Sequence, residues 1–260
     1  LVLRHRVIPT LLLHNKGLYK TVKYSIKKGK YVGDPINAIK ILNDKGIDEL
    51  IFLDIDASKE KKQPDFNMIK NIASECFMPL AYGGGIVSLS QIKTIFQIGI
   101  EKVIINSILF EDITFLQKAS NMFGSQSIVA SVDIKKNMFG KYRVYNSSKK
   151  RNLNLDIREY LLSLEKNGAG EIYISCVDRD GTFEGYDTEI IKKVIKGIKI
   201  PIIINGGARN IKDFSKAINE CGVHAVSAGS FFVFNGPHKA VLITYPDYSD
   251  LEEELKRTYE

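Results

Sequence analysis

Eight short apolar runs, separated by amphipathic segments with helical periodicity, are the feature that most restricts how this chain can fold. One intervening segment, "DPINAIKILNDKG", has Asp34 as a candidate cap and Pro35 at the first helical position, and another, "SLSQIKTIFQIG", ends at Gly99. The apolar runs cover residues 6–13, 49–54, 78–82, 102–106, 127–133, 171–176, 200–205 and 224–228. No linker interrupts the alternation, so the pattern predicts one domain over residues 1–260, an α/β single (β/α)8 barrel of the TIM type.

An internal repeat divides this barrel into two halves. "GIDELIFLDIDAS", "MPLAYGGGI" and "IEKVIINSI" match "GAGEIYISCVDRD", "IPIIINGGA" and "VHAVSAGS". The matched pairs, each 122 residues apart, are Glu49 with Glu171, Asp56 with Asp178, Pro79 with Pro201 and Gly85 with Gly207. The repeat predicts half-barrels of about residues 1–123 and 124–260. Extended backwards with a one-residue slip, it aligns Leu12 with Asp133.

Composition excludes several classes of protein. No apolar run approaches the length of a membrane helix, and no signal-peptide layout is visible, so we expect a cytoplasmic protein without a membrane partner. The three cysteines, Cys76, Cys176 and Cys221, have no C-x-x-C spacing, which favours reduced thiols and predicts neither a metal site nor a cofactor. The formal charge of +7 permits an RNA-binding face, but the lysines are interleaved with acids and form no stripe with aromatic residues. A solvated basic surface without a nucleic-acid partner is the preferred interpretation.

Glycine-rich turns follow the third and seventh predicted strands. "GGG" at 83–85 and "NGGA" at 205–208 place bare backbone amides before helix N-termini, where negative charge is favoured. "NS" at 106–107 and "AGS" at 228–230 follow the neighbouring strands and offer further amides and hydroxyls. A single Gly-Gly pair would be read as a tight turn. The duplication instead predicts two phosphate sites, built on Gly84, Gly85 and Ser107 in one half and on Gly206, Gly207, Gly229 and Ser230 in the other, and therefore a ligand with a phosphate at each end.

The residues also carry a family resemblance. "RVIP", "YGGGI", "EKVIINS", "FGSQSIVASVDIKK", "DRDGTFEGYDTE" and "IIINGGA" resemble the cyclase subunit of imidazole glycerol phosphate synthase, the HisF family. The resemblance implies a barrel that receives ammonia from a glutaminase on its N-terminal face. It further implies that the ammonia reaches a bis-phosphorylated substrate at the C-terminal face, where the family's lyase reaction forms imidazole glycerol phosphate.

The same resemblance assigns roles to individual residues. The family uses two aspartates, at the ends of strands one and five, as acid and base. The second is present as Asp133, whereas "IPTLLL" places Leu12 where the first belongs. Leucine cannot transfer a proton, and losing one member of such a pair costs on the order of two to four decades of rate. Further matches to residues around the family's substrate are Lys20, Asp54, Asn106, Asp180, Gly181 and Ser230.

Four charged residues begin predicted strands at the opposite end. Arg6, Glu49, Lys102 and Glu171 match the family's ring of charges at the ammonia entrance. Charges pointing into the bottom of a barrel are costly unless they pair with one another. Each residue alone would be interpreted as an exposed charge at a strand start, but the complete matching set favours an ammonia gate.

Three functions follow. "IPTLLLHNKGLYKT" and "KAVLITYP" resemble a divergent HisF-like subfamily that accompanies an N-acetyl sugar amidotransferase and a glutaminase in surface-glycan biosynthesis. That resemblance implies ammonia supply for converting an acetamido to an acetamidino sugar. The alternative is the histidine-pathway cyclase, with His14 or Asn15 replacing the missing acid, although each also fits a loop residue. The third is a subunit that only activates the glutaminase and channels ammonia.

Overall fold

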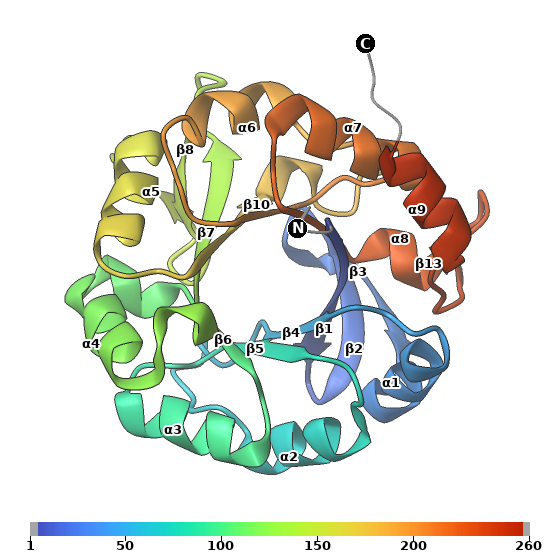
Figure 1. The fold of residues 1–260 in the computed structure, drawn as a ribbon, viewed down its shortest axis with the longest axis horizontal. Helices are drawn as coiled ribbons and strands as arrows, with labels where there is room; N and C mark the ends of the chain where they lie inside the picture. Colours follow the sequence, from blue (N-terminus) through green and yellow to red (C-terminus); the bar gives the residue numbers. More distant parts are fainter. Residues whose placement is uncertain (1–4, 257–260) are drawn as a thin grey trace.

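Eight parallel strands form a closed barrel in the computed structural model, which describes residues 5–256 (Figure 1). The strands are β1 (Arg6–His14), β4 (Leu50–Asp54), β5 (Leu80–Gly83), β6 (Lys102–Ile105), β7 (Ile128–Lys136), β10 (Glu171–Cys176), β11 (Ile202–Asn205) and β12 (Ala225–Ala228). They pair in this order, and β12 pairs with β1 to close the ring. All eight correspond to the expected apolar runs, and the (β/α)8 barrel predicted from the sequence is confirmed.

Helices surround the barrel (Figure 1). They are α1 (Pro35–Asp44), α2 (Phe66–Glu75), α3 (Leu89–Ile98), α4 (Thr114–Phe123), α5 (Ile157–Lys166), α6 (Thr188–Val194), α7 (Ile211–Cys221), α8 (Ser230–Val233) and α9 (Tyr248–Lys256), with short 3-10 turns at Ser107–Phe110, Ser125–Ser127 and Val177–Arg179. The expected caps are present. The Asp34 side chain accepts a hydrogen bond from the Asn37 amide, and Gly99 ends α3 in the left-handed conformation with φ 108°.

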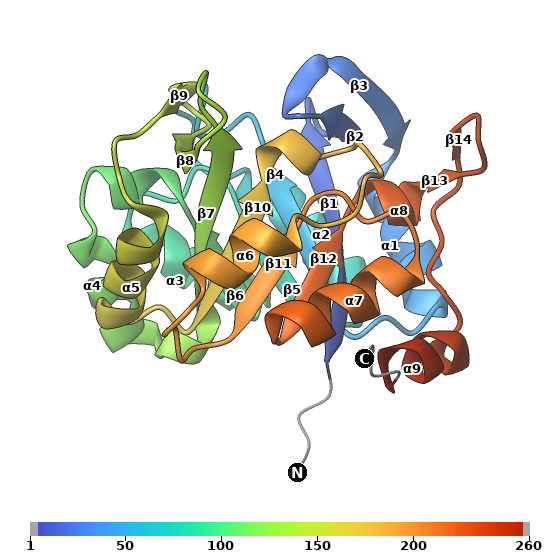
Figure 2. The same cartoon turned by 90° about the horizontal axis from the view of Figure 1, so that it is seen from above.

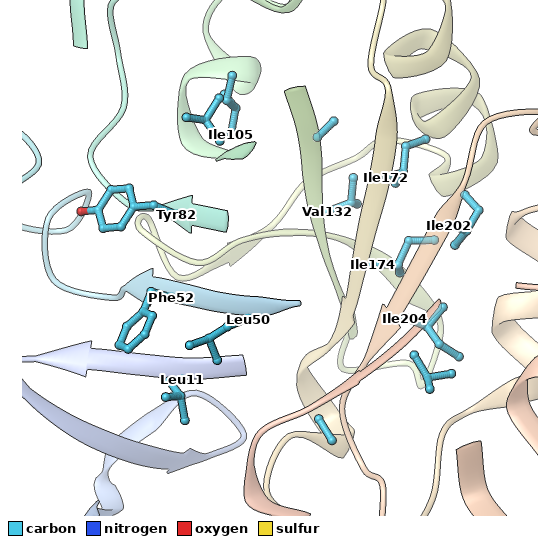
Figure 3. Packing of buried hydrophobic residues seen from close by; sticks show 14 of the residues in the cluster. Leu11, Leu50, Phe52, Tyr82, Ile105, Val132, Ile172, Ile174, Ile202 and Ile204 are labelled. Atoms are coloured by element: carbon cyan, nitrogen blue, oxygen red, sulfur yellow. The ribbon is translucent and has the colours of Figure 1, made fainter. Parts of the chain in front are cut away.

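The core has two layers because successive side chains of a strand point to opposite faces. Outward side chains such as Leu11, Phe52 and Ile174 pack beneath the helices (Figure 3). Inward side chains form a second cluster inside the barrel: Ile8, Ile51, Ala81, Ile104, Val129, Tyr173, Ile203 and Ala225. The barrel is therefore filled, and the central cavity lies beyond this inner cluster, at the C-terminal ends of the strands.

Three antiparallel hairpins were not anticipated from the sequence. They are β2 (Gly17–Val22) with β3 (Ser25–Gly33), β8 (Tyr142–Asn146) with β9 (Arg151–Asn152), and β13 (Phe234–Asn235) with β14 (Ala240–Val241). Figure 2 shows them towards the end of the barrel at which strand β7 ends. β2 continues from β1 in antiparallel pairing, where the sequence indicated only a polar loop. The β2–β3 and β8–β9 hairpins contribute residues to the wall of the central cavity.

Within the described range, no helix is long and apolar enough to span a membrane.

Candidate active site

Four alternating charges close the N-terminal end of the barrel interior. Arg6 bonds Glu49 at 2.5 Å and also bonds Glu171. Lys102 Nζ lies 3.1 Å from Glu49 Oε1 and 2.9 Å from Glu171 Oε2, so each cation contacts both acids. The two carboxylates are buried, and their charges are balanced by the two cations. The sequence placed these residues at strand starts, and the structure brings all four into one closed ring, the charge ring.

The inner apolar cluster separates the charge ring from the C-terminal mouth. Arg6, Ile8, Thr10 and Leu12 alternate along β1 with their side chains inward. The six residue steps from Arg6 to Leu12 correspond to about 20 Å of extended strand. Above the apolar cluster, the hydroxyl of Thr10 bonds Ser227 and lies 3.3 Å from the Tyr173 hydroxyl. A molecule that entered at the charge ring would meet first an apolar layer and then these hydroxyls.

Asp133 stands at the C-terminal mouth on the inward face of β7. Tyr24 donates its hydroxyl proton to Asp133 Oδ1 at 2.7 Å, and Asn106 Nδ2 lies 3.4 Å from Oδ2. Burial raises the pKa of Asp133 to about 6, opposed by hydrogen bonds from Tyr24, Ser147 and Asn106. At neutral pH the carboxylate is therefore mostly ionised, with a pKa suited to accepting a proton.

Leu12 lines the same central cavity as Asp133, together with Leu53 and Ile104. Its side chain is buried, and no carboxyl group stands at the end of β1. The alignment of Leu12 with Asp133 in the sequence therefore corresponds to two residues of one chamber. The chamber has an ionisable group on the β7 side and an apolar surface at the end of β1.

Lys20 and Asp180 form a buried ion pair at the edge of this chamber. Lys20 Nζ lies 3.3 Å from Asp180 Oδ1, and Thr21 donates to Asp180 Oδ2 at 2.6 Å. Both members line the central cavity and also a smaller adjoining one. Lys20 therefore presents a cation where the two cavities meet.

The first glycine turn lies on the side of the chamber where β5 and β6 end. Gly84 has φ 131°, and a β-carbon there would lie 2.5 Å from the Asp54 carbonyl oxygen, so only glycine fits. The Gly85 amide donates to the Ser58 hydroxyl at 3.2 Å, and Asp54 accepts from the amides of Asp56 and Ala57. Asn106 and Ser107 complete this side of the cavity. The structure thus groups Asp54, Gly84, Gly85, Asn106 and Ser107 as the sequence predicted.

The second glycine turn lines the smaller cavity. Gly206 and Gly207 have φ of 105° and 109°, and the cavity wall also includes Gly181, Gly229 and Ser230. A β-carbon on Gly229 would lie 2.4 Å from Lys20 Nζ, so the lysine reaches directly over this backbone. The Ser230 hydroxyl is buried and finds no hydrogen-bond partner among the described atoms. An unpaired buried donor beside a lysine and bare backbone fits an anionic ligand group such as phosphate.

His14 and Asn15, the sequence candidates for replacing the missing acid, are used elsewhere. His14 Nδ1 lies 2.8 Å from Asp56 Oδ1, and the Asn15 amide donates to Asp56 Oδ2 at 2.9 Å. Neither residue lines the central cavity. Among residues 5–256, no cluster of three or more His, Cys, Asp or Glu side chains is placed to hold a metal ion.

Several chamber residues had no sequence signal. Ser147 and Ser148 enter from the β8–β9 hairpin, Lys59 from the loop after β4, and Tyr24 from the β2–β3 turn. Burial lowers the pKa of Lys59. These residues lie in segments that read as polar loops, so their approach to the chamber depends on hairpins that the sequence pattern did not predict. For Tyr24, the one available signal was an aromatic residue within a lysine-rich polar stretch.

Comparisons with known proteins agree with this architecture. Residues 6–238 match the family model described as "Histidine biosynthesis protein". A Pseudomonas aeruginosa protein named "Putative imidazole glycerol phosphate synthase subunit hisF2" is 45% identical over 251 residues, covering 96% of this chain and 99% of the relative. "Imidazole glycerol phosphate synthase subunit HisF" of Alkaliphilus metalliredigens is 35% identical over 230 residues, covering 88% of this chain and 90% of the relative.

The matched residues 6–238 include all eight strands of the barrel. The chain therefore belongs to the histidine biosynthesis protein family, as a divergent HisF-like member.

Proposed function

We propose that this barrel is an ammonia-using synthase subunit of the HisF type. A glutaminase subunit, HisH-like in chemistry, docks on the N-terminal face, and its ammonia enters at the charge ring and reaches the chamber at Asp133. The observation that carries this proposal is the closed ring of Arg6, Glu49, Lys102 and Glu171 at one end of the barrel. Such a ring has little use without a small polar molecule to admit. We place the complex in the cytoplasm.

For the acceptor, we propose an acetamido sugar that is converted to an acetamidino sugar in surface-glycan biosynthesis, together with an N-acetyl sugar amidotransferase. Leu12 supports this choice, because the chamber lacks the strand-one acid on which the family's cyclisation relies. The similarity of the chain's first and last segments to the corresponding HisF-like subfamily points the same way. Lys20, Gly207 and Ser230 would hold a phosphate of the ligand.

The histidine-pathway cyclase, a lyase acting on a bis-phosphate ribonucleotide, is the second candidate. Its support is the pair of glycine turns, which lie on either side of Asp133 and suit a ligand with a phosphate at each end. A subunit that only activates the glutaminase and channels ammonia is the remaining alternative. It is supported by the charge ring alone and makes no use of Asp133.

The test is reconstitution of the barrel with its glutaminase and glutamine labelled with nitrogen-15 in the side-chain amide. Two acceptors are offered separately: the bis-phosphate ribonucleotide of the cyclase reaction, and an acetamido sugar with its amidotransferase. Label in an acetamidino product, with cyclase turnover orders of magnitude below that of HisF relatives, supports the proposal. Cyclase turnover comparable to those relatives would replace it with the second candidate. If the barrel stimulates glutamine hydrolysis but no label reaches either acceptor, the remaining alternative, a subunit that only activates the glutaminase and channels ammonia, would be supported.

A further inference from the structure

Tyr24 reaches the chamber from a backbone turn that non-glycine residues rarely adopt. Val22 pairs with Ser25, so the β2–β3 hairpin turns through two residues, Lys23 and Tyr24, with φ of 51° and 61°. Two-residue hairpins of this kind normally carry Asn-Gly, because positive φ is unfavourable for residues with a side chain. Strained residues of this type persist where the surrounding structure fixes them, and they cluster at functional sites.

Asp180 holds this turn over the mouth of the barrel, and Gly181 allows the two loops to approach closely. The Tyr24 amide donates to Asp180 Oδ2 at 3.2 Å, and the Lys23 amide donates to the Asp180 carbonyl at 2.9 Å. The approach requires glycine at the next position, since a β-carbon on Gly181 would lie 2.4 Å from the Thr21 carbonyl oxygen. The turn is therefore fixed by the loop after β10, and with it the direction of the Tyr24 side chain.

The Tyr24 hydroxyl lies among other polar groups of the mouth. Asn205 Nδ2 donates to Ser175 Oγ at 2.9 Å, Tyr24 donates to Asp133 at 2.7 Å, and the Ser175 hydroxyl lies near enough to the Tyr24 oxygen to lower the pKa of the phenol. Burial and the Asp133 charge raise the pKa of Tyr24, so the phenol keeps its proton and acts as a donor. The Ser175 hydroxyl has the opposite effect and stabilises negative charge on the phenol oxygen.

We propose that Tyr24 is the proton donor that faces Asp133 in the chamber and supplies, from the β2–β3 hairpin, the second proton-transfer group that β1 lacks. The inference rests on the proposed function in one respect, that ammonia reacts with a phosphorylated substrate in this chamber. It does not depend on which of the two acceptors is used.

Tyr24 and Asp133 can together complete a cycle of proton transfers. The ammonia nitrogen forms a bond to an electrophilic substrate carbon and gives one proton to the Asp133 carboxylate. As the bond from that carbon to its leaving oxygen or nitrogen breaks, the leaving atom takes the Tyr24 phenol proton. The proton on Asp133 then crosses the hydrogen bond to the Tyr24 oxygen, which restores both groups to their starting state.

Two measurements on the full-length protein test the proposal, with Tyr24→Phe as the variant and Tyr19→Phe as its matched control on the same hairpin. In the first, the Asp133 carboxyl is titrated by carbon-13 NMR without substrate. We expect a midpoint near 6 in the unmodified protein and an increase of about one pH unit in Tyr24→Phe, because a donor to the carboxylate is lost. Tyr19→Phe leaves the midpoint unchanged. An unchanged midpoint in Tyr24→Phe would overturn the pairing.

In the second, ammonium chloride and the bis-phosphate ribonucleotide serve as probes. We expect slow turnover above the buffer rate, a kcat lower by on the order of 100-fold in Tyr24→Phe with KM little changed, and no further loss when Asp133→Asn is added. Turnover by Tyr24→Phe equal to that of Tyr19→Phe would reduce Tyr24 to a structural role and refute the proposal. Turnover at the buffer rate in the unmodified protein, both with the bis-phosphate and with the acetamido sugar and its amidotransferase, would also refute it. If that protein still binds the glutaminase and the bis-phosphate, the failure lies with Tyr24 and not with the proposed function.

Discussion

Leu12 and Asp133 end strands β1 and β7 at the same mouth, and the difference between these two side chains defines the chemistry of the chamber. Asp133 is enclosed yet has three hydrogen-bonding neighbours, so its pKa is raised only to about 6. Leu12 pairs with Leu53 across the sheet, and Leu53 and Ile104 line the same cavity. A carboxyl group at position 12 would therefore meet a less polar environment than the one at position 133.

Leu12→Asp tests this difference through stability. Without polar partners, burial will raise the folded-state pKa of the new carboxyl above its unfolded value, so the unfolded state releases its proton first as the pH rises. The free energy of unfolding should thus fall between pH 4 and pH 8, with a cost at pH 8 of about 1–3 kcal/mol relative to Leu12→Asn. Urea denaturation of both variants at the two pH values measures it. Equal pH dependence for the two variants would show that the site solvates a carboxylate.

Asp133 should itself reduce stability at neutral pH. Its pKa of about 6 in the folded protein exceeds the reference value of 3.8, so ionisation favours the unfolded state as the pH rises between about 4 and 6. Asp133→Asn removes this charge while keeping an oxygen that accepts from Tyr24. We expect the variant to be more stable at pH 7.5, by about 1–3 kcal/mol, and to gain much less at pH 4. Thermal melts of both proteins at the two pH values measure this difference. A loss of stability in the variant at pH 7.5 would indicate that the Asp133 charge is well compensated in the folded protein.

Among the elements, the β2–β3 hairpin does most to complete the chamber, and Asp180 attaches it. This carboxylate is buried and bonds Lys20, Thr21 and the Tyr24 amide. Removing it would leave the Lys20 ammonium buried without its partner. Outside its pairing with β1, the hairpin is thus joined to the barrel by Asp180 and by the bond from Tyr24 to Asp133.

Asp180→Ala should therefore loosen the hairpin selectively. We expect a loss of stability on the order of 3 kcal/mol, with faster amide hydrogen exchange in residues 17–33 and little change in β11. Hydrogen exchange followed by mass spectrometry gives both regions in one experiment. Asp112→Asn, an exposed change before α4, serves as the control. Uniformly faster exchange across the barrel would mean that Asp180 stabilises the whole fold and not the hairpin in particular.

The sequence predicted those elements whose hydrophobic residues follow a clear pattern. The eight barrel strands are buried on both faces, so each appears as an apolar run that any reader of the sequence can find. The β2–β3 hairpin was not predicted because apolar and polar residues alternate only weakly along β3, where Lys27, Lys28 and Lys30 are exposed. Its turn also carries Lys-Tyr in place of the usual Asn-Gly. Glycines with a required positive φ marked both turns at the rim, whereas Tyr24 depends on tertiary contacts with Asp180 that no local pattern encodes.

At the scale of the whole molecule, the charge ring and the chamber lie at opposite ends of one closed barrel. The inner apolar cluster between them contains two alanines, Ala81 and Ala225, beside the large Tyr173 ring. Tyr173 bonds Thr10 on β1, so its ring extends across part of the interior towards that strand. If ammonia passes through the interior, we expect its path to lie away from the Tyr173 ring, beside the small Ala81 side chain of β5.

Two variants of the charge ring can separate its structural role from a role in gating ammonia. Lys102→Glu leaves Arg6 facing three carboxylates, so we expect a loss of stability of about 2 kcal/mol and weaker use of glutamine. The double change Lys102→Glu with Glu171→Lys restores two charges of each sign but leaves like charges adjacent at two of the four contacts, so thermal stability should return only in part. If the ring gates ammonia, the double variant will still use ammonium chloride normally while its glutamine-dependent transfer remains reduced. Melting temperatures and the ratio of glutamine-dependent to ammonium-dependent product measure the two effects. A double variant that recovers both stability and glutamine use would show that the ring needs only balanced charge, whereas unchanged glutamine use in Lys102→Glu alone would refute the gate.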